Sequence, residues 1–90
     1  MEVRLEGGPL DDELLIARAR AGDQNAFTEL VRRYQEVAFR TAYVILADPD
    51  GAADAAQEAF IKAFRALPGF DPKRPFKPWL LRIVVNEALN

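Results

Sequence analysis

Hydrophobic side chains recur at intervals of three and four residues along most of the chain, which is the spacing of amphipathic helices. The first such segment covers about residues 13 to 21 and is stopped by Gly22. Asp11 and Asp12 offer capping oxygens at its start. Asp23 caps a second, longer helix. The predicted buried face of that helix consists of Phe27, Leu30, Val31, Tyr34, Val37, Ala38, Ala42 and Ile45.

The Asp-Pro-Asp-Gly sequence at residues 48 to 51 is a strong turn signal. Its proline disfavours helical backbone at Asp48, and Asp50 is the predicted cap of a third helix. That helix covers about residues 52 to 67 and stops at Pro68. The predicted buried face of the third helix consists of Ala53, Ala56, Phe60, Ala63, Phe64 and Leu67.

A proline-stiffened basic loop over residues 70 to 76 leads into a last helix, which accepts Pro78 in its first turn. No segment shows the alternation of a β-strand. We therefore expect an all-α fold, a small bundle of about four helices with short connections, over residues 11 to 90. Residues 1 to 10 show no periodicity and are expected to form a flexible arm.

The amino-acid composition excludes several kinds of site and of protein. Half of the 90 residues are hydrophobic, which suits one small domain, and the chain has neither cysteine nor histidine, which excludes zinc sites and disulfides. No cofactor is expected. No apolar run approaches the length of a membrane span, and the first ten residues lack the apolar stretch of a signal peptide. We expect a cytoplasmic protein without membrane insertion.

Charge is divided unevenly along the chain, although the net charge is only −2. Residues 1 to 59 hold 6 basic and 12 acidic side chains, whereas residues 60 to 90 hold 6 basic and 2 acidic side chains. The second part therefore carries a net charge of +4. This asymmetry indicates two partners, of which one is a polyanion, although chance segregation would also produce it.

A polar stripe in the third helix lies beside the predicted buried face. Its members are spaced by three, four and seven residues, and they are Asp54, Gln57, Glu58 and Ile61. Such a stripe usually just faces water. An isoleucine among polar residues instead favours a helix-on-helix contact, with apolar area for affinity and polar groups for register.

The last helix carries Trp79, Arg82 and Asn86 on one face, at intervals of three and four. Tryptophan can stack on or wedge against a base, arginine can hold a phosphate, and asparagine can bond a base edge. Trp79 is equally compatible with a place in the core, and Asn86 with an ordinary polar position. The combination of these three residues with the basic loop favours nucleic acid as the binding partner.

The residues from Asp11 to Asn90 resemble region 2 of the extracytoplasmic-function (ECF) group in the sigma-70 family of bacterial transcription initiation factors. The resemblance is carried by Gly22-Asp23, Ala26-Phe27, Leu30-Val31-Arg32-Arg33-Tyr34, Ala52-Ala53-Asp54-Ala55-Ala56-Gln57-Glu58-Ala59-Phe60, Phe76, Trp79-Leu80-Leu81-Arg82-Ile83 and Asn86. Trp79 is followed by Leu80 where primary sigma factors have a second tryptophan, which fits the ECF group and implies a weaker wedge.

The resemblance implies that the stripe of Asp54, Gln57, Glu58 and Ile61 docks on the clamp helices of the polymerase β′ subunit. It also implies an anti-sigma factor as a further partner. Family members continue with a domain that binds the minus-thirty-five promoter element. We expect a chain that ends at Asn90 to be region 2 alone.

The resemblance further implies that the basic loop, with Phe70 and Phe76, helps to form a pocket for a flipped base of the minus-ten promoter element. Trp79 would wedge at the upstream edge of the melted bubble, and Asn86 would contact upstream bases of the non-template strand. Binding of the exposed strand would offset unpairing without ATP. Phosphates would be held by Lys62, Arg65, Lys73, Arg74, Lys77 and Arg82.

Two other classes of function remain. If the protein is a helical protein-interaction adaptor, we expect Trp79 to be buried and the basic side chains to diverge. If it binds DNA, we expect Lys73 and Arg74 to line one groove with Trp79 and Asn86. An enzyme is disfavoured, because the carboxylates show no convergent pair and no loop has the glycine pattern that cradles phosphate.

Overall fold

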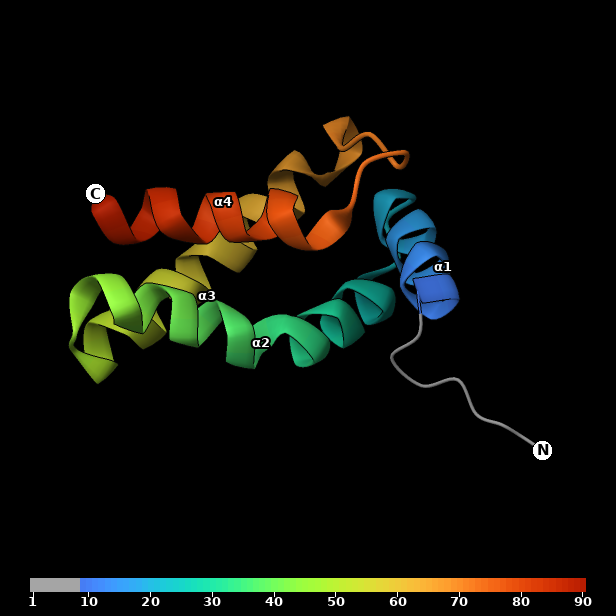
Figure 1. The fold of residues 1–90 in the computed structure, drawn as a ribbon. Coiled ribbons are helices and arrows are strands. Elements are labelled where there is room, and N and C mark those ends of the chain that lie inside the picture. The colour runs from blue at the N-terminus through green and yellow to red at the C-terminus, as the bar shows by residue number, and fades with distance from the viewer. Residues whose placement is uncertain (1–8) are drawn as a thin grey trace.

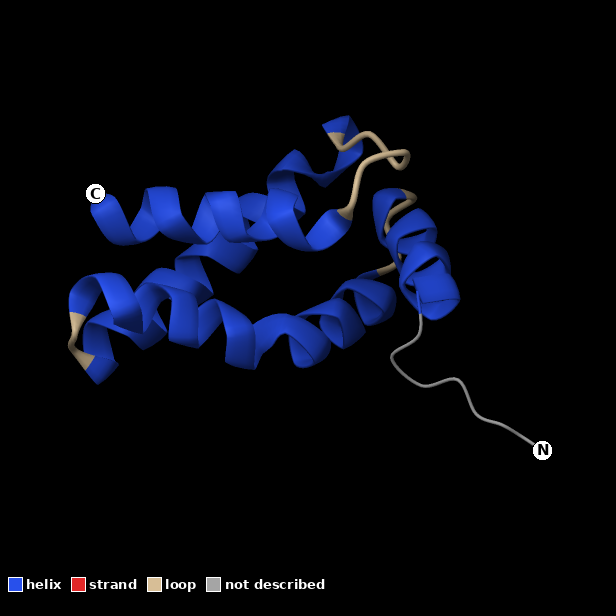
Figure 2. Ribbon diagram, in the orientation of Figure 1, coloured by secondary structure: helices blue, strands red, loops and turns tan. Residues whose placement is uncertain are grey.

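Every regular element in the computed structural model, which describes residues 9 to 90, is a helix (Figure 2). The elements are α1 (Pro9–Arg20), α2 (Gln24–Leu46), α3 (Pro49–Ala66), a short 3-10 helix η1 (Leu67–Gly69) and α4 (Phe76–Leu89). The predicted all-α bundle of four helices is confirmed. No described helix is both long enough and apolar enough to cross a membrane.

The helices α2 and α3 form an antiparallel pair, and α4 packs against both (Figure 1). The helix α1 lies across one end of this bundle, beside the start of α2 and the loop that precedes α4 (Figure 1). The end of α4 lies at the other end of the bundle, near the turn between α2 and α3. The loop from residue 70 to 75 is therefore held against α1.

The first helix begins at Pro9, earlier than predicted. Proline suits the first turn of a helix, where no amide hydrogen is needed. Residues 9 and 10 of the expected arm are therefore helical, and residues 1 to 8 lie outside the described part. Asp12 lies inside α1 and does not cap it. Gly22 follows the helix with a φ of 102°, which glycine adopts without strain.

Aspartates cap the next two helices. The Asp23 carboxylate accepts hydrogen bonds from the amides of Asn25 and Ala26, at 3.0 and 3.2 Å, as predicted. At the start of α3 the predicted cap is wrong. Asp48 has extended backbone and accepts a bond of 2.8 Å from the Gly51 amide, while Asp50 lies within the first turn. Pro49 enforces that extended geometry on the residue before it.

The core is built around α3, which is covered on two sides by α2 and α4. Small residues make this possible, because alanine allows helices to approach closely. Ala53, predicted as buried, is exposed, whereas Ala52, Ala55 and Ala59 are buried together with the predicted residues Ala56, Phe60, Ala63 and Leu67. Ile45 is also wrongly predicted, because the buried stripe of α2 ends at Ala42 and Ile45 is 36% exposed.

Candidate binding surfaces

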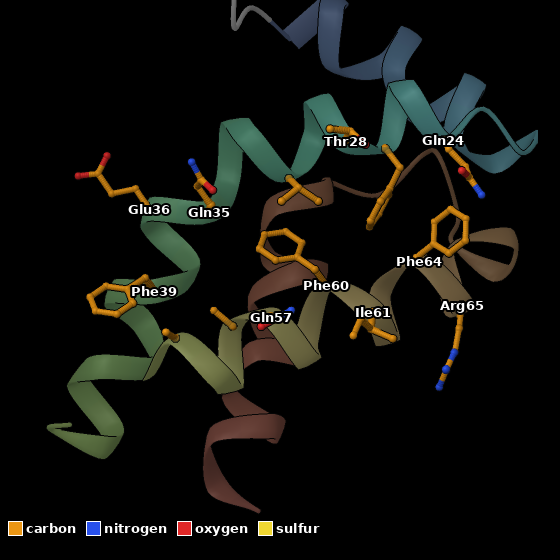
Figure 3. A pocket seen from close by; sticks show the side chains of 14 residues that line it. Gln24, Thr28, Gln35, Glu36, Phe39, Gln57, Phe60, Ile61, Phe64 and Arg65 are labelled. Atoms are coloured by element: carbon orange, nitrogen blue, oxygen red, sulfur yellow. The ribbon is translucent and has the colours of Figure 1, made fainter. Parts of the chain in front are cut away.

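An apolar groove of about 930 Å³ runs between α2 and α3. Phe27, Phe60 and Phe64 form part of its wall, and Figure 3 shows Phe60 and Phe64. The rings of Phe27 and Phe64 meet edge to face, with centroids 4.8 Å apart. Ile61, which is 40% exposed, and Gln57 lie at its α3 side. The groove is an uncovered continuation of the core.

The groove gathers only part of the predicted polar stripe. Gln57 and Ile61 line it, whereas Asp54 is exposed outside it and Glu58 is half-buried outside it. Arg65, predicted to hold DNA phosphate, lines this groove instead of joining the basic loop (Figure 3). Since Arg65 lies one turn beyond Ile61 on α3, it extends the polar edge of the groove.

Sequence reasoning missed the contribution of α2 to this groove. Val31, Gln35 and Phe39 line it, and Phe39 stacks on Tyr43 with ring centroids 5.9 Å apart. These residues lie four apart along the helix, so their common face is visible in the sequence. The sequence does not show how the other helices pack and leave this face open.

A polar cluster ties α1 to α2. Asp12 forms an ion pair of 2.8 Å with Arg33, and the Tyr34 hydroxyl donates a hydrogen bond to the same carboxylate. Burial of the Tyr34 ring, reinforced by the Asp12 carboxylate, raises the pKa of Tyr34 above its ordinary value. Tyr34 also packs edge to face on Phe76, with centroids 5.3 Å apart. This cluster fixes α1 beside the start of α4.

A second groove, of about 620 Å³, lies between α1 and the basic loop. Lys73, Arg74 and Lys77 line it from the loop side. The Asp71 side chain accepts a hydrogen bond from the Lys73 amide, and the Asp71 carbonyl accepts one from the Arg74 amide, both at 2.9 Å. This turn holds the exposed basic side chains at the edge of the groove.

Three aromatic side chains pack together and support the basic loop. Phe70 and Phe76 are only 3% and 7% exposed, and their rings lie with centroids 5.7 Å apart. Trp79 is half-buried against both rings, at 4.8 Å from Phe70 and 5.6 Å from Phe76. Phe70 and Phe76, which were predicted to help form a DNA pocket, are therefore core residues that offer little surface of their own to a ligand.

The predicted face of α4 is present, but it does not line the groove beside the basic loop. Arg82 and Asn86 are exposed, and with the half-buried Trp79 they follow one another along the helix. The structure therefore groups the basic loop in one groove and leaves Trp79 and Asn86 on an adjoining helix face.

The basic residues predicted to bind phosphate differ in whether a carboxylate already pairs with them. Lys62 on α3 forms an ion pair of 2.7 Å with Glu87 on α4, and this hydrogen bond raises the pKa of Lys62. Lys62 is therefore a link between helices. Within residues 12 to 90, no carboxylate lies within 4.0 Å of the basic groups of Lys73, Arg74, Lys77 or Arg82. Their charges remain available to an anion.

Residues 30 to 90 match the family described as Sigma-70 region 2. The chain is 46% identical over 83 residues to the ECF RNA polymerase sigma-E factor of Escherichia coli K12, covering 90% of the chain and 42% of that factor. It is 43% identical over 79 residues to the RNA polymerase sigma-H factor of Pseudomonas aeruginosa, covering 88% and 41%. The chain thus spans about two fifths of these relatives.

Two solved structures have a similar fold. One is an NMR structure of an engineered region 2 of sigmaE in complex with GTAAAA, with a TM-score of 0.82 and 46% identity over 87% of this chain and 81% of that one. The other is CnrH in complex with the cytosolic domain of CnrY, with a TM-score of 0.81 and 37% identity over 88% and 51%.

Proposed function

The chain belongs to the sigma-70 region 2 family, with similarity to factors of its ECF group, and from this membership we propose its function. It is the part of a bacterial transcription initiation factor that binds core RNA polymerase and recognises and melts the minus-ten promoter element. It binds and positions its partners and catalyses no reaction. These partners place it in the cytoplasm.

Core polymerase docks, in this proposal, on the groove between α2 and α3. The groove has an aromatic wall with Gln57 and Ile61 at its edge, and this combination of an apolar centre and a polar rim is typical of protein interfaces. Asp54 and Glu58 extend the contact along α3. A pair of helices, such as the clamp helices of the β′ subunit, presents the elongated apolar surface that such a groove accepts.

The non-template strand binds, in this proposal, along the basic loop and the exposed face of α4. Lys73, Arg74, Lys77 and Arg82 hold phosphates, and Asn86 reads a base edge. Trp79, supported by Phe70 and Phe76, offers an aromatic ring on which a base stacks at the boundary of the melted region. The gain from capturing unstacked bases offsets the few kcal/mol that unpairing costs.

The observation that carries the DNA assignment is a set of exposed basic groups that have no carboxylate partner among residues 12 to 90, in a chain whose net charge is negative. The complex of an engineered sigmaE region 2 with the oligonucleotide GTAAAA supports the same assignment. The complex of CnrH with CnrY supports a further protein partner, which we propose to be an anti-sigma factor.

Fluorescence anisotropy with single-stranded minus-ten oligonucleotides of varied sequence tests this function. We expect Asn86→Ala to weaken binding of the preferred sequence and to leave other sequences unchanged, because it removes a base contact. Lys73→Ala should weaken binding of every sequence by a similar factor, because it removes a phosphate contact.

Arg40→Ala is the charge-matched control, since Arg40 is exposed on α2 and pairs with Glu36. It should leave binding unchanged. If the wild-type protein binds no oligonucleotide, the DNA assignment is wrong and a helical adaptor is the better description. Equal losses on every sequence for Asn86→Ala would contradict its role in base reading.

A further inference from the structure

The groove between α1 and the basic loop contains one more basic side chain, which belongs to α1. Arg20 donates a hydrogen bond of 3.4 Å from its Nη2 atom to the Pro68 carbonyl in η1. Its Nε atom is buried and has no hydrogen-bond partner among the described residues, so a ligand cannot reach that atom. Arg20 also lines the groove, where the Nη atoms of its guanidinium can donate to an acceptor.

The charge balance of this groove favours an anion. Arg20 lines it from α1, whereas Lys73, Arg74 and Lys77 line it from the basic loop and the start of α4. The described part of the lining has two carboxylates, and Asp12 is already occupied by Arg33 and Tyr34. Among the described residues, Glu13 then remains against four basic groups. This part of the groove therefore carries a net positive charge.

A phosphate fits this arrangement better than a carboxylate or a neutral polar group. Arginine presents a planar set of donors that matches phosphate oxygens, and lysine adds a point charge. The groove lies beside the start of α4, where Lys77 lines it, and the face on which the proposed strand lies begins two residues later on the same helix, at Trp79. A backbone that follows α4 thus reaches this groove.

We propose that the groove between α1 and the basic loop binds one backbone phosphate of the captured DNA strand, and that Arg20 is the ligand supplied by α1. This inference rests on the proposed function. It extends the DNA-binding surface to a helix that lies outside the part of the chain matching the family, residues 30–90. The same helix, tied to α2 through Asp12, then positions the loop and contacts the strand.

The test uses Arg20→Gln, with Arg18→Gln as its control. Arg18 lies on the same helix, is exposed and does not line the groove, so both variants change the net charge of α1 equally. Binding of a single-stranded minus-ten oligonucleotide is measured by anisotropy at several salt concentrations. We expect Arg20→Gln to raise the dissociation constant roughly tenfold, as loss of a charge-assisted hydrogen bond does.

Salt dependence separates a phosphate ligand from a structural residue. Loss of one phosphate contact on a single strand lowers the slope of log affinity against log salt by about 0.7. Arg20→Gln should show that change, and Arg18→Gln should not. Arg20→Lys should restore much of the slope, because it retains the charge.

Chemical substitution locates the phosphate. Methylphosphonate is placed at one linkage of the oligonucleotide after another, and one position should weaken wild-type binding without weakening Arg20→Gln further. Inorganic phosphate and a mononucleotide serve as competitors. If either displaces the strand at millimolar concentration, the groove is a site for free phosphate and the inference is overturned.

The remaining outcomes are distinct. If the wild-type protein binds no oligonucleotide, the proposed function itself fails. If the wild type binds and the two glutamine variants behave alike, only this inference is refuted. A loss for Arg20→Gln with an unchanged salt slope and a lowered melting temperature would show that Arg20 only holds α1 to η1, which also overturns it.

Discussion

At the scale of single residues, two positions depart from what their neighbours in sequence suggest. Ala47 ends α2 with a φ of 53°, in the left-handed region that glycine normally occupies. Asp12 has the residue type of a helix cap, yet its carboxylate binds Arg33 and Tyr34 on another helix. Each position leads to a prediction about the stability of the fold, which can be tested without polymerase or DNA.

Ala47→Gly should stabilise the fold. Its amide donates a hydrogen bond of 2.8 Å to the Tyr43 carbonyl, which glycine retains. Relief of the left-handed strain should raise the free energy of unfolding by about 1 kcal/mol. Urea denaturation measures the change. The control Ala53→Gly, in the interior of α3, should lower the same free energy by about 1 kcal/mol. A loss for both variants would contradict the strain at Ala47.

Tyr34 should make the fold sensitive to alkaline pH. Because burial and Asp12 raise its pKa in the folded state, the folded protein retains this proton where the unfolded chain loses it. The stability from Tyr34 is therefore complete below about pH 10, the ordinary tyrosine pKa, and is lost as pH rises through the higher folded value.

Urea denaturation at about pH 8 and about pH 11 measures this effect. Tyr34→Phe should reduce the difference between the two pH values. Tyr43→Phe is the matched control, because Tyr43 is exposed and its hydroxyl makes no hydrogen bond within the described residues. The idea fails if Tyr34→Phe retains the full alkaline loss.

At the scale of elements, α4 combines a buried face and a free face on fourteen residues. Its buried residues Phe76, Leu80, Val84 and Ala88 recur every fourth position, while Arg82 and Asn86 lie between them and are exposed. The core therefore holds the helix in place without using its proposed DNA-binding face. Stability and binding should respond to different substitutions.

Leu80→Ala tests the buried face. Leu80 is fully buried, so its truncation leaves a cavity and should cost about 2–5 kcal/mol of unfolding free energy. Leu89→Ala changes the same residue type on the same helix, where it is 69% exposed, and should cost less than about 0.5 kcal/mol. Thermal and urea unfolding measure both variants. Similar costs would show that α4 is not packed as described.

At the scale of the whole molecule, the two proposed surfaces lie on different parts of the bundle. One is the groove between α2 and α3, and the other joins the basic loop to the face of α4. The core beneath both is continuous, and Lys62 and Glu87 link α3 to α4 at the surface. In the proposed function, this continuous core would act as a rigid body that holds polymerase and promoter strand in a constant relation.

Substitutions should separate the two activities. Gln57→Ala combined with Glu58→Ala should weaken binding of a β′ clamp-helix fragment at least about tenfold, as loss of interface residues does. The same protein should bind the minus-ten oligonucleotide normally and keep its melting temperature, since neither side chain is in the core. Anisotropy with each labelled partner measures both affinities.

Lys73→Ala is the reciprocal control and should weaken only the oligonucleotide complex. If the double variant retains the clamp-helix fragment, the groove is not the docking site. If each variant impairs both complexes, the two surfaces are coupled and the rigid-body description is wrong.

Local pattern determined the elements of this protein. The three-and-four spacing predicted the four helices, Asp23 and Gly22 marked real boundaries, and the proline at position 49 fixed the turn before α3. The same spacing placed Asp54, Gln57, Glu58 and Ile61 along one stripe of α3. These results follow because helical periodicity and capping act over three or four residues.

Only the tertiary structure decided which faces remain open and which side chains pair. It buried Phe70 and Phe76, engaged Lys62 with Glu87, moved Arg65 to the other groove and brought Arg20 opposite the basic loop. These contacts join residues that are far apart in sequence, and they depend on how helices cross and which neighbour covers each face. Periodicity carries no information on that arrangement.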